Sequence, residues 1–416
     1  MHAYIDGIAL PGKPRPKLIA IDKDNDAFAS YGKEQGANAP VSERAAHAYA
    51  TALNKLLSKS GGTDPKTKRP KWTNRVQIGD ATTLFWAEAA GGLEGAKRAN
   101  SAESLFAILA DPPTDEQEAA KLQALLRSVE QGRPLEEIDP SLEGDTRFWI
   151  LGLSPNAARL STRFFLRSTL GEIVAHAAEH YRDLSIDPAA WKTPPSAWWL
   201  LRETAVQHEA DNVSPVLAGE VARAIFTGRR YPRSLLAATL MRIRAEGEIT
   251  GLRVAITKAC LARAHRKDIE QNNPDPEEDV PVSLDRNETN PGYRLGRLFY
   301  VLENAQRLGI GGVNTTIRDK FYASASANPA RIFPLLLRGA QDHIGAVRKK
   351  RGGGLAYWLD EQIAEIVGGL PASAPFPSTL RLEDQGRFVV GYYHQRYAAK
   401  TDGKDAEDLP ETNEEE

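Results

Sequence analysis

Apolar side chains recur every three to four residues through the last third of the chain, and this spacing constrains the fold more than any other feature. Leu295, Leu298 and Leu302 form one such stripe. Three further stripes of this kind begin at Pro329, Leu355 and Glu383. The period is that of amphipathic helices, and short connections between them favour an antiparallel bundle. We therefore predict an α+β, predominantly helical protein: a mixed α/β body followed by a C-terminal antiparallel helical bundle.

Charge is divided unevenly along a chain whose net charge is only -2. Residues 88–145 hold 13 acidic and 5 basic residues, whereas 147–267 hold 18 basic and 10 acidic, and 286–351 hold 12 basic and 4 acidic. Such segregation creates a local positive field on a nearly neutral protein. We predict six segments: an α+β remnant of a larger body (1–85), an acidic insertion (86–145), a basic, mainly helical domain (146–270), a linker (271–280), the bundle (281–400) and a disordered acidic tail (401–416).

Local signals place several elements within these segments. Ser42 is a good N-cap for a first helix, and "EQEAAKLQALLRSVEQG" predicts one amphipathic helix in the acidic insertion. "RFWILGLS" from Arg147 predicts a buried strand, followed by a turn into a helix that carries Arg159 and Arg163 four residues apart. Asn314 is a candidate N-cap for a short helix.

The longest bundle helix should begin with Asn328 as N-cap and Pro329 at its first position. Arg331 and Arg338 are predicted on its outer face. Its core side is predicted to hold Ile332, Leu335, Leu336, Ile344 and Val347.

Seven strings along the chain resemble one protein family, in the order in which the family has them. Three lie in the bundle: "YRLGRLFYVLENAQ" from Tyr293, "NTTIRDKFYASASANP" from Asn314 and "EDQGRFVVGYYHQR" from Glu383. Upstream are "SYGKEQGANAPVS", "VQIGDATTLFWAE", "RFWILGLSPNAARLSTRFF" and "PVSLD". Together they are similar to the large subunit of the subtype I-C CRISPR Cascade, the Cas-eight-c family. The family's members begin further upstream, with the region that reads the protospacer-adjacent motif, so we expect a split or truncated version or a separate N-terminal chain.

The resemblance implies a non-catalytic subunit of an RNA-guided surveillance complex that holds target DNA strands and supports R-loop formation in antiviral defence. Its partners would be the Cascade subunits that carry the guide RNA, the target DNA as displaced strand and duplex, and a recruited helicase–nuclease. The bundle would resemble a Cascade small subunit, and no cofactor is expected.

Basic and polar side chains in these strings and in the basic segment are the candidate nucleic-acid contacts, because Arg, Lys, Ser, Asn and Gln commonly bind phosphates. The alternative is that the arginines solvate helix faces or meet acidic surfaces of partner subunits, as in a purely structural scaffold. The predicted contacts are Lys33, Gln35, Asn38, Arg159, Arg163, Arg229, Arg230, Arg242, Arg297, Arg318, Lys320, Ser324, Arg331 and Arg338.

One string offers an enzyme alternative. "HAAEH", from His176 to His180, matches the H-x-x-E-H pattern in which two histidines bind zinc and Glu179 acts as general base. No third ligand can be identified, and the sequence has no P-loop, nucleophile elbow or paired-glycine dinucleotide motif. We therefore expect no catalytic residues and no metal, with a zinc hydrolase as the alternative.

Composition also sets the expected location. The single cysteine, Cys260, excludes a disulfide framework within the chain. No apolar run is long enough to span a membrane, and the first residues do not resemble a signal peptide. A cytoplasmic protein without membrane contact is expected. Met241, the second of only two methionines, is either an internal start for a product of 241–416 or a core methionine.

Overall fold

The computed structural model divides the chain into two compact units, with boundaries that pass through two helices. Unit 1 comprises 1–179, 193–201 and 213–228, and unit 2 comprises 180–192, 202–212 and 229–416. The residues that the structure describes are 4–8, 16, 18, 32–33, 37, 41–58, 60–63, 70–88, 90–156, 159–271, 279–311 and 315–405. The tail after 405 lies outside them.

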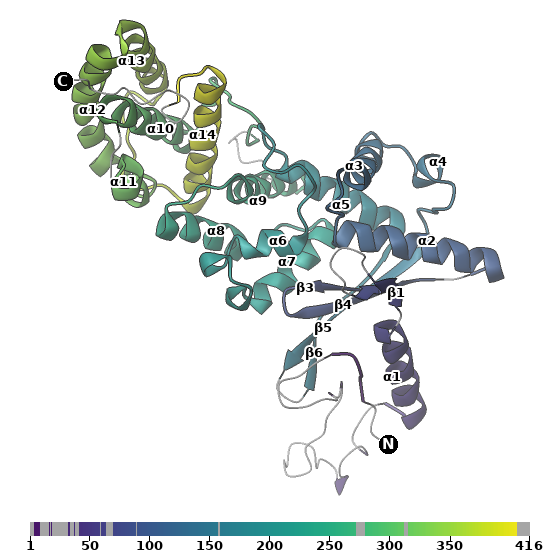
Figure 1. Cartoon of the computed structure of the whole chain (residues 1–416). Helices are drawn as coiled ribbons and strands as arrows, with labels where there is room; N and C mark the ends of the chain where they lie inside the picture. The colour runs from purple at the N-terminus through teal and green to yellow at the C-terminus, as the bar shows by residue number, and fades with distance from the viewer. Residues whose placement is uncertain are drawn as a thin grey trace. The chain divides into compact units, whose positions relative to one another are not determined.

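A four-stranded antiparallel sheet forms the centre of unit 1 (Figure 1). Each strand pairs with the next in the chain, so the sheet is a meander. Its strands are β3 (Arg75–Ile78), β4 (Ala81–Ala87), β5 (Arg147–Asn156) and β6 (Arg159–Thr169). A separate two-stranded ladder joins β1 (Ser60–Thr63) and β2 (Pro70–Trp72).

Helices cover both faces of this sheet. Phe85 and Phe148 point to one face, where Phe106 of α2 (Gly92–Ala110) packs on both rings. The other face carries Leu84 and Leu153, which belong to a buried cluster with residues of α1 (Glu43–Ser58). Figure 1 accordingly shows α1 on the side of the sheet away from α2. The remaining helices of unit 1 are α3 (Glu116–Glu130), α4 (Leu135–Ile138) and α7 (Pro215–Thr227), and the boundaries cross α5 (Leu170–Leu184) and α6 (Ala197–Arg202).

The sequence predicts α1 and α3 but misses α2. Ser42 caps α1 as expected, with its hydroxyl accepting from the Ala45 N–H at 3.2 Å. Within 86–145 only α3 shows a clear apolar stripe, whereas α2 mixes alanine and glycine with few large residues. Because Phe106 is fully buried against the sheet, part of this acidic segment contributes to the core of unit 1.

The helix predicted to carry Arg159 and Arg163 is wrong, because these residues lie in strand β6. Along β6 the chain pairs with β5 from Asn156↔Arg159 to Arg147↔Thr169. The register shifts once, where Gly152 pairs with Phe164 and Leu153 with Thr162, which leaves Arg163 as the bulged residue. Pairing with a strand that precedes it in the chain overrides the local helical composition of 157–163.

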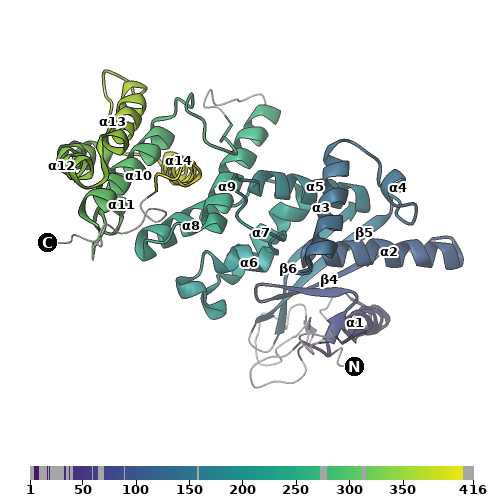
Figure 2. The same cartoon turned by 45° about the horizontal axis from the view of Figure 1, so that its top comes forward.

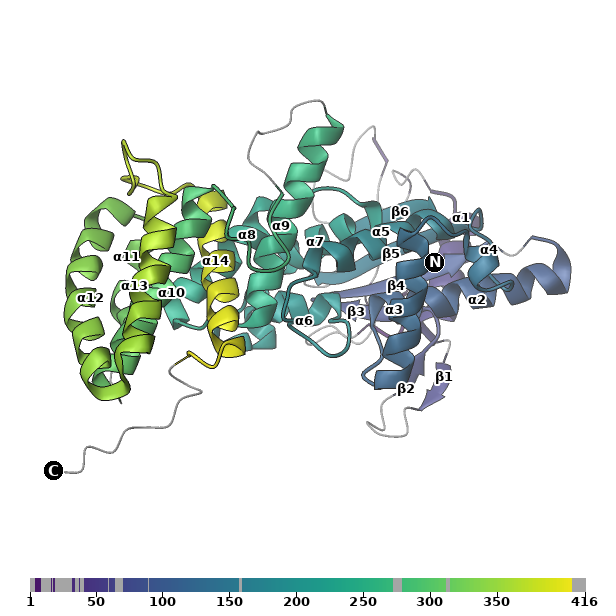
Figure 3. The same ribbon diagram turned by 90° about the horizontal axis from the view of Figure 1, so that it is seen from above.

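Helices make up most of unit 2, and Figures 2 and 3 show the last helices of the chain, α10 to α14, gathered at its C-terminal end. This bundle confirms the predominantly helical α+β class. The elements that precede it are the 3-10 turns η4 (Val206–His208) and η5 (Ala210–Asn212) and the helices α8 (Arg233–Glu246) and α9 (Gly251–Glu270). The bundle helices are α10 (Pro291–Ile310), α11 (Ile317–Ala325), α12 (Pro329–Arg351), α13 (Gly353–Gly368) and α14 (Leu382–Thr401).

α10 is the central helix of the bundle, and almost every one of its residues is buried. In Figure 2 it lies between α14 on one side and α12 and α13 on the other. Tyr293 bonds His394 and Asn304 bonds the Lys404 carbonyl, so α10 and α14 run in the same direction, and the antiparallel arrangement predicted for the bundle is wrong for this pair. α13 runs antiparallel to α10, since Arg297 reaches Glu365 near the end of α13.

Two further details of the bundle differ from the sequence prediction. The N-cap of α11 is Thr316, which forms a capping box with Asp319, and Asn314 lies outside the described residues. In α12 the predicted Asn328 N-cap position is correct, but Leu335 is 52% exposed and does not belong to the core. No helix among the described residues is both long and apolar enough to cross a membrane.

Candidate nucleic-acid interface

Besides Arg297, which is described below, four of the predicted contact arginines are engaged by carboxylates. These pairs neutralise charge locally, but most are partly exposed, and a surface ion pair contributes only about 0–1 kcal/mol. The pairs are Arg163–Asp80 at 3.1 Å, Arg230–Asp268 at 2.5 Å, Arg242–Glu246 at 3.6 Å and Arg318–Glu303 at 3.8 Å.

Arg163 has a structural role that its place in the bulge explains. Its guanidinium meets Asp80 in the turn between β3 and β4, and the Ser154 hydroxyl donates to the same carboxylate oxygen. Ser154 is fully buried. This group fixes the β3–β4 turn to the β5–β6 pair, which makes Arg163 a poor candidate for a ligand contact.

Arg297 is wrong as a nucleic-acid contact, because its side chain is completely buried within the bundle. Its guanidinium bonds both Glu365 oxygens, at 3.1 and 2.5 Å, and its Nε donates to Gln395 at 2.9 Å. Gln395 in turn donates to Gln362 on α13. The arginine therefore joins α10 to α13 and α14, and no phosphate can reach it.

The remaining described candidates lie at the surface. Arg159, Arg229, Lys320, Ser324, Arg331 and Arg338 are exposed. No carboxylate among the described residues forms an ion pair with the five basic side chains of this set. Lys33 is exposed as well, whereas Gln35 and Asn38 lie outside the described residues.

The exposed candidates are most concentrated on α11 and α12, which contact each other. Arg331 and Arg338 are two helical turns apart, so they project from the same face of α12 about 10 Å apart along its axis. Lys320 and Ser324 are one turn apart on the outer side of α11. We call these four residues the α11–α12 basic face.

The far end of α12 is also basic, but it has a local explanation. Its last four residues are Arg348, Lys349, Lys350 and Arg351. Cations in the last turn of a helix are stabilised by the negative end of the helix dipole. Arg348 also pairs with Asp360 at 3.4 Å, and Arg351 donates to the Leu308 carbonyl. These four residues therefore support the bundle and add positive field to the same helix.

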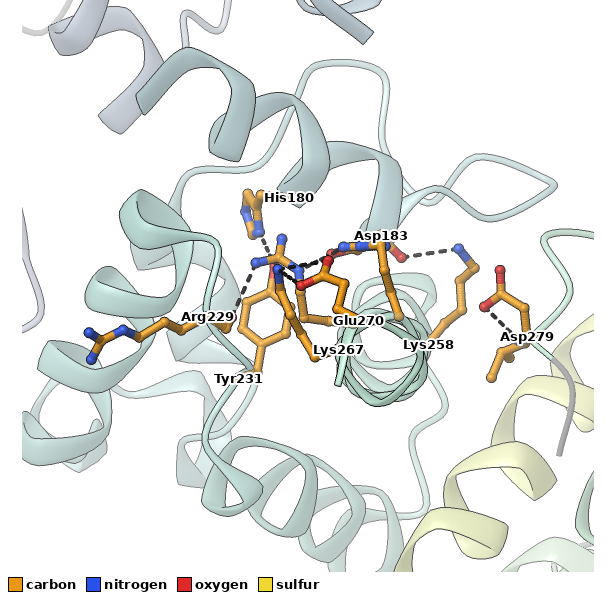
Figure 4. A network of polar contacts seen from close by, with 11 residues as sticks. His180, Asp183, Arg229, Tyr231, Lys258, Lys267, Glu270 and Asp279 are labelled. Carbon is orange, nitrogen blue, oxygen red and sulfur yellow. Dashed lines mark hydrogen bonds and ion pairs between the residues drawn. The ribbon is translucent and has the colours of Figure 1, made fainter. Parts of the chain in front are cut away.

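A second basic cluster, in unit 2, is internal (Figure 4). Asp183 at the end of α5 is almost fully buried, and it accepts from Arg263 at 2.5 Å and from Arg266 at 2.8 and 2.9 Å. The Lys258 ammonium donates to the Asp183 carbonyl at 3.2 Å, and desolvation lowers the pKa of that lysine. Three of the basic residues of 147–267 (Lys258, Arg263 and Arg266) thus bond Asp183 and join α9 to α5.

Tyr231 extends this cluster to His180. Its hydroxyl accepts from Arg263 at 3.3 Å and lies 2.5 Å from His180 Nδ1. A hydroxyl has one hydrogen and two lone pairs, so besides accepting from Arg263 it either donates to Nδ1 or accepts from it, depending on which nitrogen of the neutral ring carries the proton. Burial and the nearby Arg263 charge lower the pKa of His180 to about 3.

These bonds also account for the HAAEH string. His180 Nδ1 is occupied by Tyr231, and His176 Nδ1 bonds the Phe226 carbonyl at 3.1 Å. Among the described residues, the one group of three potential ligands with converging atoms is His208, Glu246 and Glu248, and two of these three are far along the chain from the string. The structure therefore gives both histidines of the string hydrogen-bonding roles, and within the described residues neither belongs to a group of three converging ligands.

Two buried neutral histidines should make the protein sensitive to mild acid. Burial lowers the pKa of His180 to about 3 and that of His394 to about 4, whereas an unfolded histidine titrates near 6.5. The unfolded state thus binds more protons than the folded state. The contribution of the two histidines to the free energy of unfolding is therefore fully present above about pH 6.5 and is lost as the pH falls below it. Each histidine should contribute a slope of about 1.4 kcal/mol per pH unit between pH 6 and 5.

Urea unfolding at several pH values measures this slope. His180→Gln should reduce the slope by about 1.4 kcal/mol per pH unit, which corresponds to one proton. His47→Gln alters an exposed histidine of α1 and should leave the slope unchanged. An identical slope in both variants would contradict the buried neutral state of His180.

Comparison with known proteins identifies a matching family. The sequence model of one family, described as CRISPR-associated protein (Cas_Csd1), matches residues 1–400. A search of curated proteins found no match. The matched range includes unit 1, and it includes unit 2 up to Lys400, one residue before α14 ends.

Proposed function

The chain belongs to the Cas_Csd1 family of CRISPR-associated proteins, and on that basis we propose that it is the large subunit of a subtype I-C Cascade, which holds nucleic acid and catalyses no reaction. In RNA-guided effectors the guide RNA reads the target sequence by base pairing, while protein side chains hold the backbones and the displaced strand. We propose the guide-carrying Cascade subunits, the target DNA and a recruited helicase–nuclease as its partners.

The α11–α12 basic face is the observation that carries this proposal. Arg331 and Arg338 are exposed, share one side of a long helix and have no ion-pair partner among the described residues. The core side of the same helix is packed, since Phe333 and Val347 are fully buried. The two guanidinium groups are therefore supported by a rigid element and open to solvent, as phosphate contacts require.

The mechanism is one of positioning. Contacts about 10 Å apart on a helix can hold two phosphates of one strand without reading its bases. Lys320 and Ser324 on the neighbouring helix would add a third cation and a hydroxyl donor. Binding of this kind retains a strand that guide pairing has displaced, and it tolerates any sequence.

Replacing Arg331 and Arg338 together with glutamine should weaken binding of single-stranded DNA equally for different sequences. Each lost phosphate contact on a single strand reduces the salt slope by about 0.7, so the double variant should lose about 1.4. Fluorescence anisotropy of a labelled oligonucleotide, titrated with the full chain at several salt concentrations, measures both affinity and slope.

Arg98→Gln provides the matched control, because Arg98 is also exposed but pairs with Glu143 on unit 1. Its slope should stay close to that of the unmodified chain. An unchanged slope in the double variant, with an unchanged melting temperature, would reject the α11–α12 basic face. Assembly into a Cascade complex without any binding of DNA by the chain would favour the scaffold alternative.

A further inference from the structure

We propose that the open half of the sheet face that also carries α1 is a second nucleic-acid site, at which bases of a single strand stack on aromatic rings. We call it the aromatic platform, and define it as Trp86, Trp149 and Phe165. It deepens the proposed function, since it rests on the chain being a nucleic-acid-holding subunit. It lies wholly within unit 1, apart from the α11–α12 basic face in the sequence.

Strand register brings the three rings together. Trp86 on β4 and Trp149 on β5 are direct partners in the antiparallel ladder, so their side chains leave the same face of the sheet. Their rings are nearly parallel, at 9°, with centroids 6.1 Å apart. Phe165 on β6 is a partner of Leu151, one pair along on the same face, and its ring lies 6.4 Å from that of Trp86. Three neighbouring strands thus supply one aromatic surface.

The other half of this face shows what a covered surface looks like here. Leu84 and Leu153 are fully buried beneath α1. Phe165, in contrast, is 53% exposed, and both tryptophans are only half-buried. Cross-strand stacking stabilises a sheet and accounts for the Trp86–Trp149 pair. It does not account for a third ring at the same place that leaves half its surface in water.

Cations adjoin the rings. Arg167 is the direct cross-strand partner of Trp149 on β6. It is exposed, and no carboxylate among the described residues forms an ion pair with it. Arg147 stands on the same face one pair beyond Trp149, 69% exposed, with a loose contact to Glu88 at 3.5 Å.

This combination identifies the occupant. Flat rings at the surface of a sheet stack on any base, and arginines beside them bind the phosphates that connect successive bases. A protein partner with an aliphatic surface would not need cations beside the rings, and an acidic peptide would not need three rings in one plane of strands. Charge complementarity therefore favours a single-stranded nucleic acid with unpaired bases over either.

The test uses the full chain with a double variant, Trp149→Leu and Phe165→Leu, and two oligonucleotides of equal length, oligo(dT) and its abasic counterpart. The unmodified chain should bind oligo(dT) at least about fivefold more tightly than the abasic strand, because each stacked base contributes to affinity. The double variant should lose at least about fivefold for oligo(dT) and little for the abasic strand. Its salt slope should be unchanged, since no phosphate contact is removed.

Trp199→Leu is the matched control, because Trp199 is 60% exposed but lies on α6, off the sheet. It should bind like the unmodified chain. If the double variant fails to fold, Phe165→Leu alone serves as the test, because a change at an exposed residue has little effect on stability. This single variant should still lose part of the preference for oligo(dT) over the abasic strand.

The proposal is overturned if the unmodified chain binds the two strands equally, or if the platform variant keeps the preference. A reduced salt slope after loss of Arg331 and Arg338, with no base preference in any variant, would leave the proposed function standing and remove the platform. Absence of binding to either strand by the unmodified chain would remove both.

Discussion

Replacing Asp183 with alanine is expected to lower the free energy of unfolding by about 3–5 kcal/mol. Its carboxylate is 1% exposed and is the shared partner of Arg263, which is fully buried, and of Arg266. Without it the Arg263 guanidinium keeps its charge in the interior, where the Arg229 carbonyl and the Tyr231 hydroxyl still accept from it but supply no negative charge. Removing one member of a buried ion pair is costly for this reason.

Urea unfolding of the full chain, followed by circular dichroism, measures the loss. Asp360→Ala is the control, because Asp360 pairs with Arg348 and both side chains are more than two-fifths exposed, so its loss should cost no more than about 1 kcal/mol. Asp183→Ala combined with Arg263→Met should be more stable than Asp183→Ala alone, since the second change removes the uncompensated charge. Equal effects of Asp183→Ala and Asp360→Ala would contradict the buried cluster.

The buried role of Asp183 could not be predicted from the sequence. Three residues before it stands the HAAEH string, which by pattern alone points to zinc. The partners that decide the role of this helix end, Arg263 and Arg266, are some 80 residues away in the chain. Helical spacing predicts which side chains of α5 share a face of the helix. It does not predict which distant helix pairs with a buried carboxylate, because that depends on tertiary packing.

The same cluster bears on Met241. The side chain is 55% exposed on α8, so the core alternative predicted for it is wrong. A product of 241–416 would lack Asp183 and also Glu203, which pairs with the fully buried Arg253 at 3.3 Å. An internal start would therefore leave the buried Arg263 without Asp183, and the buried Arg253 with Glu246 but without Glu203.

The bundle helices were predictable because their signal is local, whereas the side chains that face a ligand were not. Asn328, Pro329 and the apolar stripe of α12 specify that helix, and the exposure of Arg331 and Arg338 follows from it. Arg297 carries the same kind of signal, an arginine flanked by leucines, yet it is buried. The difference is that α10 is covered by neighbours on several sides, which its own sequence does not show.

The helix predicted in place of strand β6 was wrong for a related reason. The alanines and arginines of 157–163 have good helical propensity, and nothing in that stretch states that β5 will pair with it. The available signal was the β-branched and aromatic composition of Thr162, Phe164 and Phe165, which favours a strand. The aromatic platform depended on this pairing, so it could not be predicted either.

Replacing Gly296 with alanine is expected to destabilise the bundle by about 1–3 kcal/mol or more, as overpacking of a core does. A Cβ at this position would stand 1.9 Å from the Phe388 carbonyl oxygen on α14. The reciprocal contact is equally close, because a Cβ at Gly391 would stand 2.1 Å from the Tyr293 carbonyl oxygen. The two helices therefore meet backbone to backbone, and neither can yield without separating the pair.

Gly339→Ala is the matched control for this change. Gly339 also lies in a helix interior, in α12, but an added Cβ would meet nothing within 4 Å. Alanine has the higher helix propensity, so this variant should be neutral or more stable by up to about 1 kcal/mol. Thermal melting of the two single variants beside the unmodified chain separates the cases, and a melting temperature of Gly296→Ala equal to that of Gly339→Ala would show that α10 and α14 are not in contact at this point. The strings "YRLGRLF" and "FVVGYYHQR" would on this view record the crossing of two helices, which gives α11 and α12 a rigid support from which to hold a strand.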